Sequence, residues 1–319
     1  MQINEKAKPF IKWAGGKGQL LSQLDKYLPR RLYNEDFTYV EPFTGGGAML
    51  FHVLRKFPHL KMAIINDINE DLVKAYKTIK DNPLKLIDGL EAKKIEYLGL
   101  SSDEDRKNMY LEERTNFNRH IADDVTNTVL LMFLNKTCFN GLYRVNRKGE
   151  FNVPAGRYKN PMICNADTIL ADSALLNKVD IEITNRSFEE TADFIKSDRL
   201  TFFYFDPPYR PLDATSSFTS YAKGDFNDDD QRKLAAFCRQ IDSPNCLWML
   251  SNSDCCAKNP DDLFFEDLYN DFNIERVWAS RSINVNPSKR GKLTELLIRN
   301  DYEIDNRLLS KVWGTERSV

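Results

Sequence analysis

The sequence predicts an α/β fold in which one twisted sheet, flanked by helices, is interrupted by an inserted helical and β-hairpin domain. Short apolar runs alternate with helical patterns in the first 80 residues, and this alternation returns from about residue 178. The stretch between them reads as mainly helical and becomes rich in Gly and Asn after residue 136. We therefore expect a discontinuous core of residues 1–80 and 178–302, an insertion of residues 81–177 and an appended tail of residues 303–319.

The candidate core strands are short apolar runs, namely Thr38–Glu41, Met62–Asn66, Ile181–Thr184, Leu200–Phe205, Cys246–Leu250, Ile274–Trp278 and Leu293–Ile298. Helical spacing predicts helices over Glu70–Lys80, 84–98, Glu104–Ile121 and Val125–Asn135, and a run of carboxylates opens another at Asp228–Ile241. Two strand-like pieces, Leu142–Val145 and Glu150–Val153, are expected to form a hairpin.

Composition excludes several classes of protein. The chain of 319 residues has a net charge of −2, so any surface that binds nucleic acid must be local. The longest apolar runs are too short to cross a membrane, and no signal peptide opens the chain, so we expect a cytoplasmic protein. The six cysteines form no CxxC pair and stand apart from the three histidines, which argues against structural zinc.

The most informative motif ends the run Leu200–Phe205, where Asp206, Pro207, Pro208 and Tyr209 follow. Prolines cannot continue a central strand, so the acid lies at the carboxyl end of the sheet, where α/β folds bind ligands. A carboxylate and a free proline carbonyl could accept the two N–H groups of an exocyclic amine, while Tyr209 stacks on its ring. The plain alternative is a strand terminator with a proline turn.

A second motif, Glu41–Gly47, joins an apolar strand to the apolar run Ala48–Leu54 through three glycines. Such a strand, turn and helix can bring backbone N–H groups close to a cofactor, although a simple tight turn would look similar. Asp67, at the end of the next strand, is placed to bind ribose hydroxyls, or else Asp67 or Asn69 caps the following helix.

Two other motifs do not match the phosphate-binding and calcium-binding loops that they suggest. Gly16-Lys17 is no phosphate loop, because Ile11 stands at the position of the first glycine and Gly18 at that of the magnesium-binding hydroxyl. The acidic run 225–230 is no calcium loop, because Asp230 and Ala236 stand where glycine and the bidentate glutamate are required.

Positive charge is concentrated in the expected hairpin. Six basic residues, Lys136, Arg144, Arg147, Lys148, Arg157 and Lys159, stand there against the single acid Glu150. This pattern suits contact with phosphates, with Asn140, Asn146 and Arg144 able to read base edges and Phe139 able to wedge into a base stack. A solvated surface hairpin would have a similar composition.

Taken in order, the motifs resemble the Dam-type DNA adenine methyltransferases, especially the DpnM-like members that methylate GATC. The matching motifs are KWAGGK, EPFTGGGA, NDIN, FNGLYRVNRKGEFNVPAGRYKNP, YFDPPY, SFTSY, LSNS and RGKLTELLI, and they span about Pro9 to Asn300. The resemblance implies a Rossmann-like S-adenosylmethionine-dependent methyltransferase sheet with an inserted target-recognition domain. It also implies direct methyl transfer to N6 of an adenine flipped out of double-stranded DNA, with no metal. We expect a monomer or a weak dimer.

The resemblance also implies roles for individual residues. Asp206, Pro207, Pro208 and Tyr209 would hold the target base. The S-adenosylmethionine pocket would be lined by Trp13, Lys17, Phe43, Gly45, Gly47, Asp67, Phe188 and Asp206. Contacts with DNA would come from Lys136, Phe139, Asn140, Leu142, Arg144, Asn146, Pro154 and Arg157. Phe139 departs from the family pattern, because some relatives carry Tyr there.

Other functions remain open at this point. A related methyltransferase could act on N4 of cytosine, on RNA adenine or on a glutamine side chain, although Asp206 favours adenine by analogy with the family. A non-catalytic DNA-binding protein could keep the same scaffold, and a nuclease would require metal-binding acids that the proline motif accommodates poorly.

Overall fold

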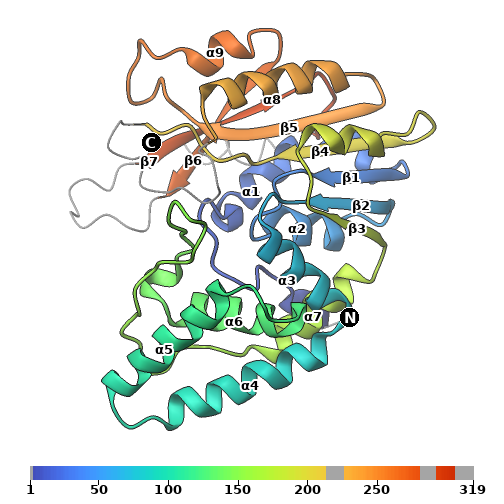
Figure 1. Cartoon of the computed structure of the whole chain (residues 1–319). Coiled ribbons are helices and arrows are strands. Elements are labelled where there is room, and N and C mark those ends of the chain that lie inside the picture. The colour runs from blue at the N-terminus through green and yellow to red at the C-terminus, as the bar shows by residue number, and fades with distance from the viewer. Residues whose placement is uncertain (1–2, 213–225, 281–291, 306–319) are drawn as a thin grey trace, which may run out of the picture.

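The computed structural model describes residues 3–212, 226–280 and 292–305, and these form one mixed sheet covered on both faces by helices (Figure 1). Within those residues the sheet has seven strands in the order β3-β2-β1-β4-β5-β7-β6. The strands are β1 Phe37–Glu41, β2 Leu60–Asn66, β3 Asp180–Thr184, β4 Leu200–Phe205, β5 Cys246–Ser253, β6 Asn273–Ser280 and β7 Lys292–Arg299. β7 runs antiparallel to β5 and β6, and the other pairs are parallel. Each of the seven predicted core strands is confirmed.

The helices follow the strands in the alternation that the sequence predicts. They are α1 Leu21–Leu24, α2 Ala48–Lys56, α3 Glu70–Asp81, α4 Pro83–Gly99, α5 Asp103–Asn118, α6 Asp124–Thr137, α7 Ala166–Leu176, α8 Asp228–Ile241 and α9 Phe264–Leu268. The acids of the rejected calcium run open α8 instead, where Asn227 and Asp230 form a capping box. None of the helices in the described part of the chain is both long and apolar enough to span a membrane.

Side chains of β4 alternate between the two faces of the sheet, as the period of a strand requires. Phe202 and Tyr204 join the core that the sheet shares with α2, α3 and the helices of the insertion. Phe203 and Phe205 join a second core with α8 and α9. Because both faces are covered, β4 is buried throughout and mostly apolar, and the polar Asp206 marks the point where the chain leaves the core.

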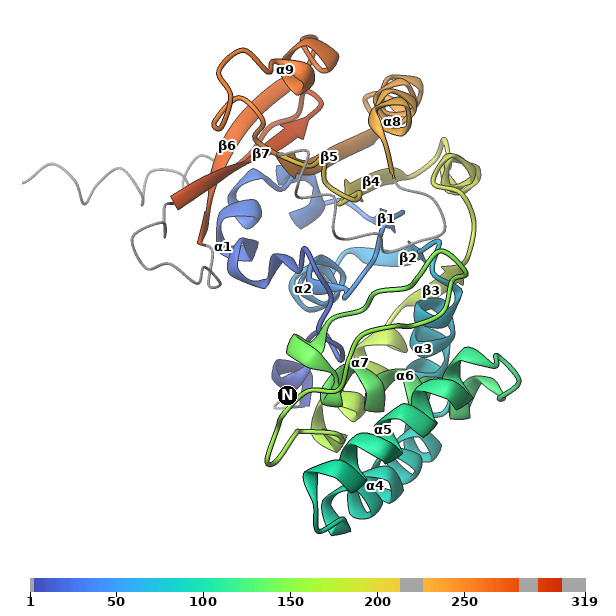
Figure 2. The same cartoon turned by 60° about the vertical axis from the view of Figure 1, so that its left-hand side comes forward.

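Helices α4–α7 lie together at one side of the sheet, away from β6 and β7 (Figures 1 and 2). α6 lies at the centre of this group and packs on α3, α4 and α5. The run 129–134 of α6 is buried on every side, which explains its unbroken apolar sequence. α7 packs on α2, α3 and α4 and was not predicted from the sequence.

The hairpin prediction needs a correction. Residues 139–158 form a narrow arm (green in Figure 2), but only isolated bridges, Val145 with Phe151 and Cys138 with Ala155, replace the two expected strands. The backbone N–H and C=O of Phe151 bond to the Asn118 side chain, and Tyr110 donates to the Val153 carbonyl. Contacts with α5 therefore take the place of a regular ladder.

Two further predictions are adjusted. α5 ends at Asn118 rather than at Ile121, because the chain turns at His120, which has a positive φ of 52°. The SFTSY motif at residues 217–221 and residues 306–319 of the expected tail lie outside the described residues.

Candidate active site

A cleft of about 540 Å³ opens at the carboxyl ends of β1, β2 and β4. Parallel strands end at the same edge, so motifs that are distant in the sequence meet here. The cleft is lined by four segments of the chain: Pro9 with residues 11–18, Glu41 with residues 43–49, residues 67–69, and Tyr204 with residues 206–209. The Gly16-Lys17 motif, the glycine turn, the acid after β2 and the proline motif therefore share one site.

The glycine turn is shaped by its lack of side chains. Gly45 and Gly47 have φ values of 51° and 74°, in the left-handed region that favours glycine. A Cβ on Gly47 would lie 2.4 Å from the Tyr76 hydroxyl, which donates to the Gly45 carbonyl at 2.9 Å. A Cβ on Gly45 would lie 3.1 Å from the Trp13 ring. The backbone therefore lies close to two aromatic side chains at the edge of the cleft.

Asp67 supports that turn from β2. Its two carboxylate oxygens accept the backbone N–H groups of Gly45 and Asn69, each at 2.9 Å. Asn69, and not Asp67, caps α3 by accepting from the N–H of Leu72. Burial raises the pKa of Asp67 above its usual value, although the two N–H donors oppose the shift.

Asp206 forms the centre of a charged group. The Lys17 ammonium, only 4% exposed, lies 2.9 Å from Oδ1 of Asp206 and donates to the Gly15 carbonyl. It also lies 4.2 Å from the centre of the Tyr209 ring and 3.8 Å from Oε2 of Glu295 on β7. Tyr209 in turn donates its hydroxyl to Glu295 at 2.6 Å.

Burial sets the ionisation of this site. It raises the pKa of Asp206 to about 6, with Lys17 opposing the shift and Glu295 adding to it. Burial also raises the pKa of Glu41 well above its usual range, an effect that Asp206 and Asp67 reinforce. Glu41 accepts the Tyr39 hydroxyl at 2.7 Å, and with a pKa of about 6 most of Asp206 is ionised at neutral pH.

The proline motif is held in place by buried polar side chains. Gln231 of α8 donates to the Pro208 carbonyl at 3.0 Å, and Asn252 of β5 donates to Gln231 and accepts from the Arg210 N–H. Gln231 and Asn252 are fully buried, so these hydrogen bonds are screened from water.

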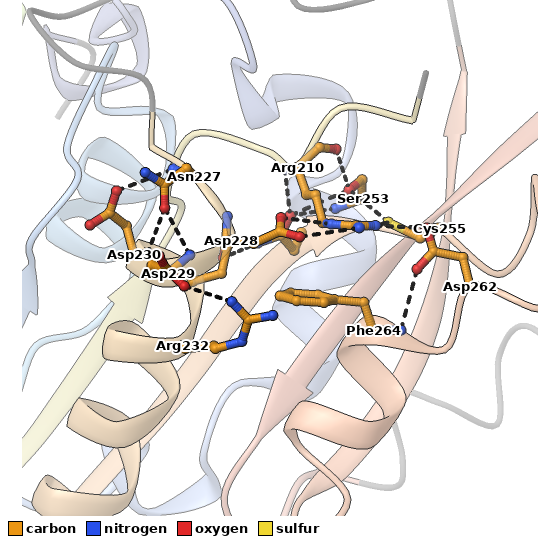
Figure 3. A network of polar contacts seen from close by, with 12 residues as sticks. Arg210, Asn227, Asp228, Asp229, Asp230, Arg232, Ser253, Cys255, Asp262 and Phe264 are labelled. Carbon is orange, nitrogen blue, oxygen red and sulfur yellow. Dashed lines mark hydrogen bonds and ion pairs between the residues drawn. The ribbon is translucent and has the colours of Figure 1, made fainter. Parts of the chain in front are cut away.

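Figure 3 shows how the next residue, Arg210, ties the motif to two more elements. Its guanidinium pairs with Asp228 at the start of α8 and with Asp262 before α9, and it lies 4.5 Å from the centre of the Phe264 ring. Ser253 of β5 donates to its carbonyl. The chain is therefore fixed immediately after Tyr209.

The predicted cofactor residues meet at the cleft with one exception. Trp13, Lys17, Phe43, Gly45, Gly47, Asp67 and Asp206 all line it. Phe188 does not line the cleft but packs on Phe43, with ring centres 5.5 Å apart.

The predicted DNA residues differ in their surroundings. Phe139, Asn140, Pro154 and Arg157 are exposed on the arm. Two others bond within the arm: Arg144 donates to the side chain and carbonyl of Asn152, and Asn146 closes the turn by bonding to Glu150. Leu142 packs on the core. Lys136 lies at the end of α6, where burial and the charge of Lys8 lower its pKa.

Sequence reasoning missed a buried clasp that joins the arm to the cleft. Asn135 of α6 accepts the Lys12 N–H at 2.9 Å and donates to the carbonyls of Lys12 and Gly141. The Lys12 ammonium donates to the Asn140 carbonyl at 2.5 Å, and the Trp13 ring lies 4.8 Å from that of Tyr143. Lys12 and Trp13 are more than 100 residues from Asn135, Asn140 and Tyr143 in the sequence, so no local pattern reveals these contacts.

Metal ligands do not gather in the described part of the chain. No group of three or more His, Cys, Asp or Glu residues there is placed to hold an ion.

The sheet order, its antiparallel β7 and the cleft over β1, β2 and β4 define a Rossmann-like methyltransferase. Residues 13–283 match the family described as D12 class N6 adenine-specific DNA methyltransferase. The chain belongs to that family and is an adenine-specific DNA methyltransferase.

Curated relatives are similar over nearly their whole length. The type II methyltransferase M.MjaIII of Methanocaldococcus jannaschii is 48% identical, over 92% of this chain and 99% of the relative. The type II methyltransferase M1.LlaDCHI of Lactococcus lactis subsp. cremoris is 40% identical, over 92% and 95%. A DNA adenine methylase of Haemophilus influenzae is 32% identical, over 92% and 93%.

Proposed function

We propose that this enzyme transfers a methyl group from S-adenosylmethionine to N6 of an adenine flipped out of double-stranded DNA, within the sequence GATC. The observation that carries the proposal is the Asp206 carboxylate, which is held by Lys17 at the end of β4 and faces the same cleft as the glycine turn. GATC rests on the resemblance of the arm to the recognition segment of the DpnM-like enzymes.

The residues of the cleft fit S-adenosylmethionine. With both carboxylates ionised, the cluster of Lys17, Asp206 and Glu295 carries one net negative charge. This charge complements a sulfonium cation. Asp67 keeps accepting capacity for ribose hydroxyls, because each carboxylate oxygen has two lone pairs and each bonds to one backbone N–H. Trp13, Phe43 and the turn at Gly45 and Gly47 would line the rest. When bound, the cofactor supplies an electrophilic methyl group on a good leaving group.

The chain's own part in the reaction is to position the amine. Ionised Asp206 accepts one N–H of the exocyclic amine, and the Pro207 carbonyl accepts the other. Pro208 is tied to Gln231, which keeps the turn rigid, and Tyr209 stacks on the adenine ring. Lys17 keeps Asp206 in place and favours its ionised form. Neither a metal nor a covalent intermediate on the enzyme is required.

The arm is the proposed reader of the DNA, within a target-recognition insertion of residues 81–177. Its exposed Phe139 and Arg157 are available to the base stack and to a base edge or phosphate. The clasp at Asn135 fixes the base of the arm to the segment that lines the cleft. The arm and the residues that line the cleft are thereby held at a fixed distance from each other.

The test compares short DNA duplexes that differ only in the GATC site. One carries GATC, one has the target adenine already methylated, and one has the four bases in scrambled order. We expect label from S-adenosylmethionine to enter only the first duplex, as N6-methyladenine. Methylation of the scrambled duplex at another adenine would contradict GATC, and transfer without S-adenosylmethionine would contradict the cofactor.

A further inference from the structure

Glu295 is a second carboxylate in the cleft, and the sequence motifs give it no role. It lies on β7, opposite Ser253 of β5 and Val277 of β6, and its side chain is 21% exposed. Its Oε2 accepts the Tyr209 hydroxyl at 2.6 Å and lies 3.8 Å from the Lys17 ammonium. One oxygen therefore contacts two residues that surround Asp206.

Holding Tyr209 alone would not require a charge. A glutamine could accept the same hydroxyl bond, and a second carboxylate near Asp206 is unfavourable in a partly buried site. The Lys17 ammonium lies between the two carboxylates, 2.9 Å from Asp206 and 3.8 Å from Glu295. The negative charge of Glu295 is thus placed where it acts on Asp206 as well as on the Tyr209 ring.

We propose that Glu295 is a positioning residue for methyl transfer, which holds the Tyr209 ring and the Lys17 ammonium in place beside Asp206. This role rests on the proposed function of Asp206 and Tyr209. Glu295 acts through these neighbours: its bond to the phenol hydroxyl fixes where the ring lies, and its charge draws Lys17 toward β7.

The first test is a double-mutant cycle on kcat/KM for DNA. Glu295→Ala and Tyr209→Phe each remove one end of the same hydrogen bond, which involves a charged group. We expect each to lower kcat/KM by about tenfold to a hundredfold. The double variant should be no worse than the more damaged single variant. Independent, multiplicative losses, or full activity of Glu295→Ala, would overturn the proposal.

The second test uses Glu295→Gln, which keeps the shape and an acceptor for Tyr209 but removes the charge. It should recover much of the activity that Glu295→Ala loses. Activity requires ionised Asp206, so kcat/KM of the wild type should fall below about pH 6. Glu295 raises the pKa of Asp206, so the midpoint should move to lower pH in Glu295→Gln. An unchanged midpoint would contradict the proposal.

The other charged and titratable groups around Asp206 stay the same in this comparison. They are Lys17, Tyr209, Tyr204 of β4, and Tyr39 and Glu41 of β1. The matched control is Glu275→Gln on the neighbouring strand β6, where the carboxylate lies 3.7 Å from Arg299. It removes the same charge from the same sheet and should leave the midpoint of the profile unchanged.

If the proposed function of Asp206 is wrong, the results will differ from those expected when only the role of Glu295 is wrong. Asp206→Asn is assayed beside the Glu295 variants. If Asp206→Asn methylates normally, the proposed function of the site is wrong. If it is inactive while the Glu295 variants match the wild type in rate and pH profile, only the role of Glu295 is wrong. Should Glu295→Ala fail to fold, as judged by thermal unfolding, the pH profile of Glu295→Gln decides alone.

Discussion

Gly47 shows how much of the cleft depends on one residue without a side chain. It precedes α2 in the left-handed region, and the Tyr76 hydroxyl occupies the space that a Cβ would fill. Tyr76 uses that hydroxyl to hold the Gly45 carbonyl. The turn that lines the cleft is therefore set by a glycine and a buried tyrosine together.

Gly47→Ala should both destabilise the protein and weaken binding of S-adenosylmethionine. The positive φ and the displaced Tyr76 should lower the free energy of unfolding by about 1–3 kcal/mol. Urea unfolding and calorimetric binding measure the two effects. The control is Gly99→Ala at the end of α4, where a Cβ meets nothing within 4 Å. Equal behaviour of the two variants would contradict the close packing at Gly47.

At the scale of elements, α6 connects the cleft to the arm. Its buried Asn135 satisfies one N–H and two carbonyls, from the cleft segment at Lys12 and the arm at Gly141. The arm has only isolated bridges of its own, so it depends on α5 and on this clasp for its position. An arm without a regular strand ladder is held in place by its neighbours.

Asn135→Ala should damage stability and DNA recognition together. It leaves the Lys12 N–H and two carbonyls without their partner, which should lower the free energy of unfolding by about 2–4 kcal/mol. Urea unfolding and the preference for GATC over a scrambled duplex are the measurements. Asn108→Ala, on the exposed face of α5, is the control and should change neither. An Asn135 variant with wild-type preference would show that the clasp does not position the arm.

Arg144→Ala should relax the choice of base at one position of the recognition site. Its guanidinium uses two N–H donors on the side chain and carbonyl of Asn152, and its remaining donors are the ones expected to read a base edge. Methylation of all single-base variants of the site measures the effect, with exposed Arg30→Ala as the control. A uniform loss over every sequence would instead identify Arg144 as a phosphate contact.

At the scale of the whole molecule, the sequence predicts the sheet well because its apolar runs are buried on both faces. The site is also largely predictable, since Asp67 and Asp206 end parallel strands that must meet at one edge. α7 escaped prediction because its polar Asp172 and Ser173 are buried with its apolar residues, which hides any amphipathic stripe. Glu295 escaped because it reaches Tyr209 from 86 residues away, through the register of β7.

The DNA-binding prediction also has a part that the sequence shows and a part that depends on tertiary structure. The basic composition of the arm was visible in the sequence, but composition does not say which side chains the arm uses for its own structure. Arg144 and Asn146 bond within it, whereas Arg157 is exposed. Such contacts follow from the packing of the arm on α5, which depends on tertiary structure.

The most direct test of the account compares the wild type with Asp206→Ala on unmethylated genomic DNA and S-adenosylmethionine, followed by sequencing of modified bases. The account predicts N6-methyladenine at GATC with the wild type. It predicts none with the variant, although the variant still binds duplex DNA in a gel-shift assay. Methylation by Asp206→Ala at the wild-type rate would contradict the central claim that this carboxylate holds the target amine.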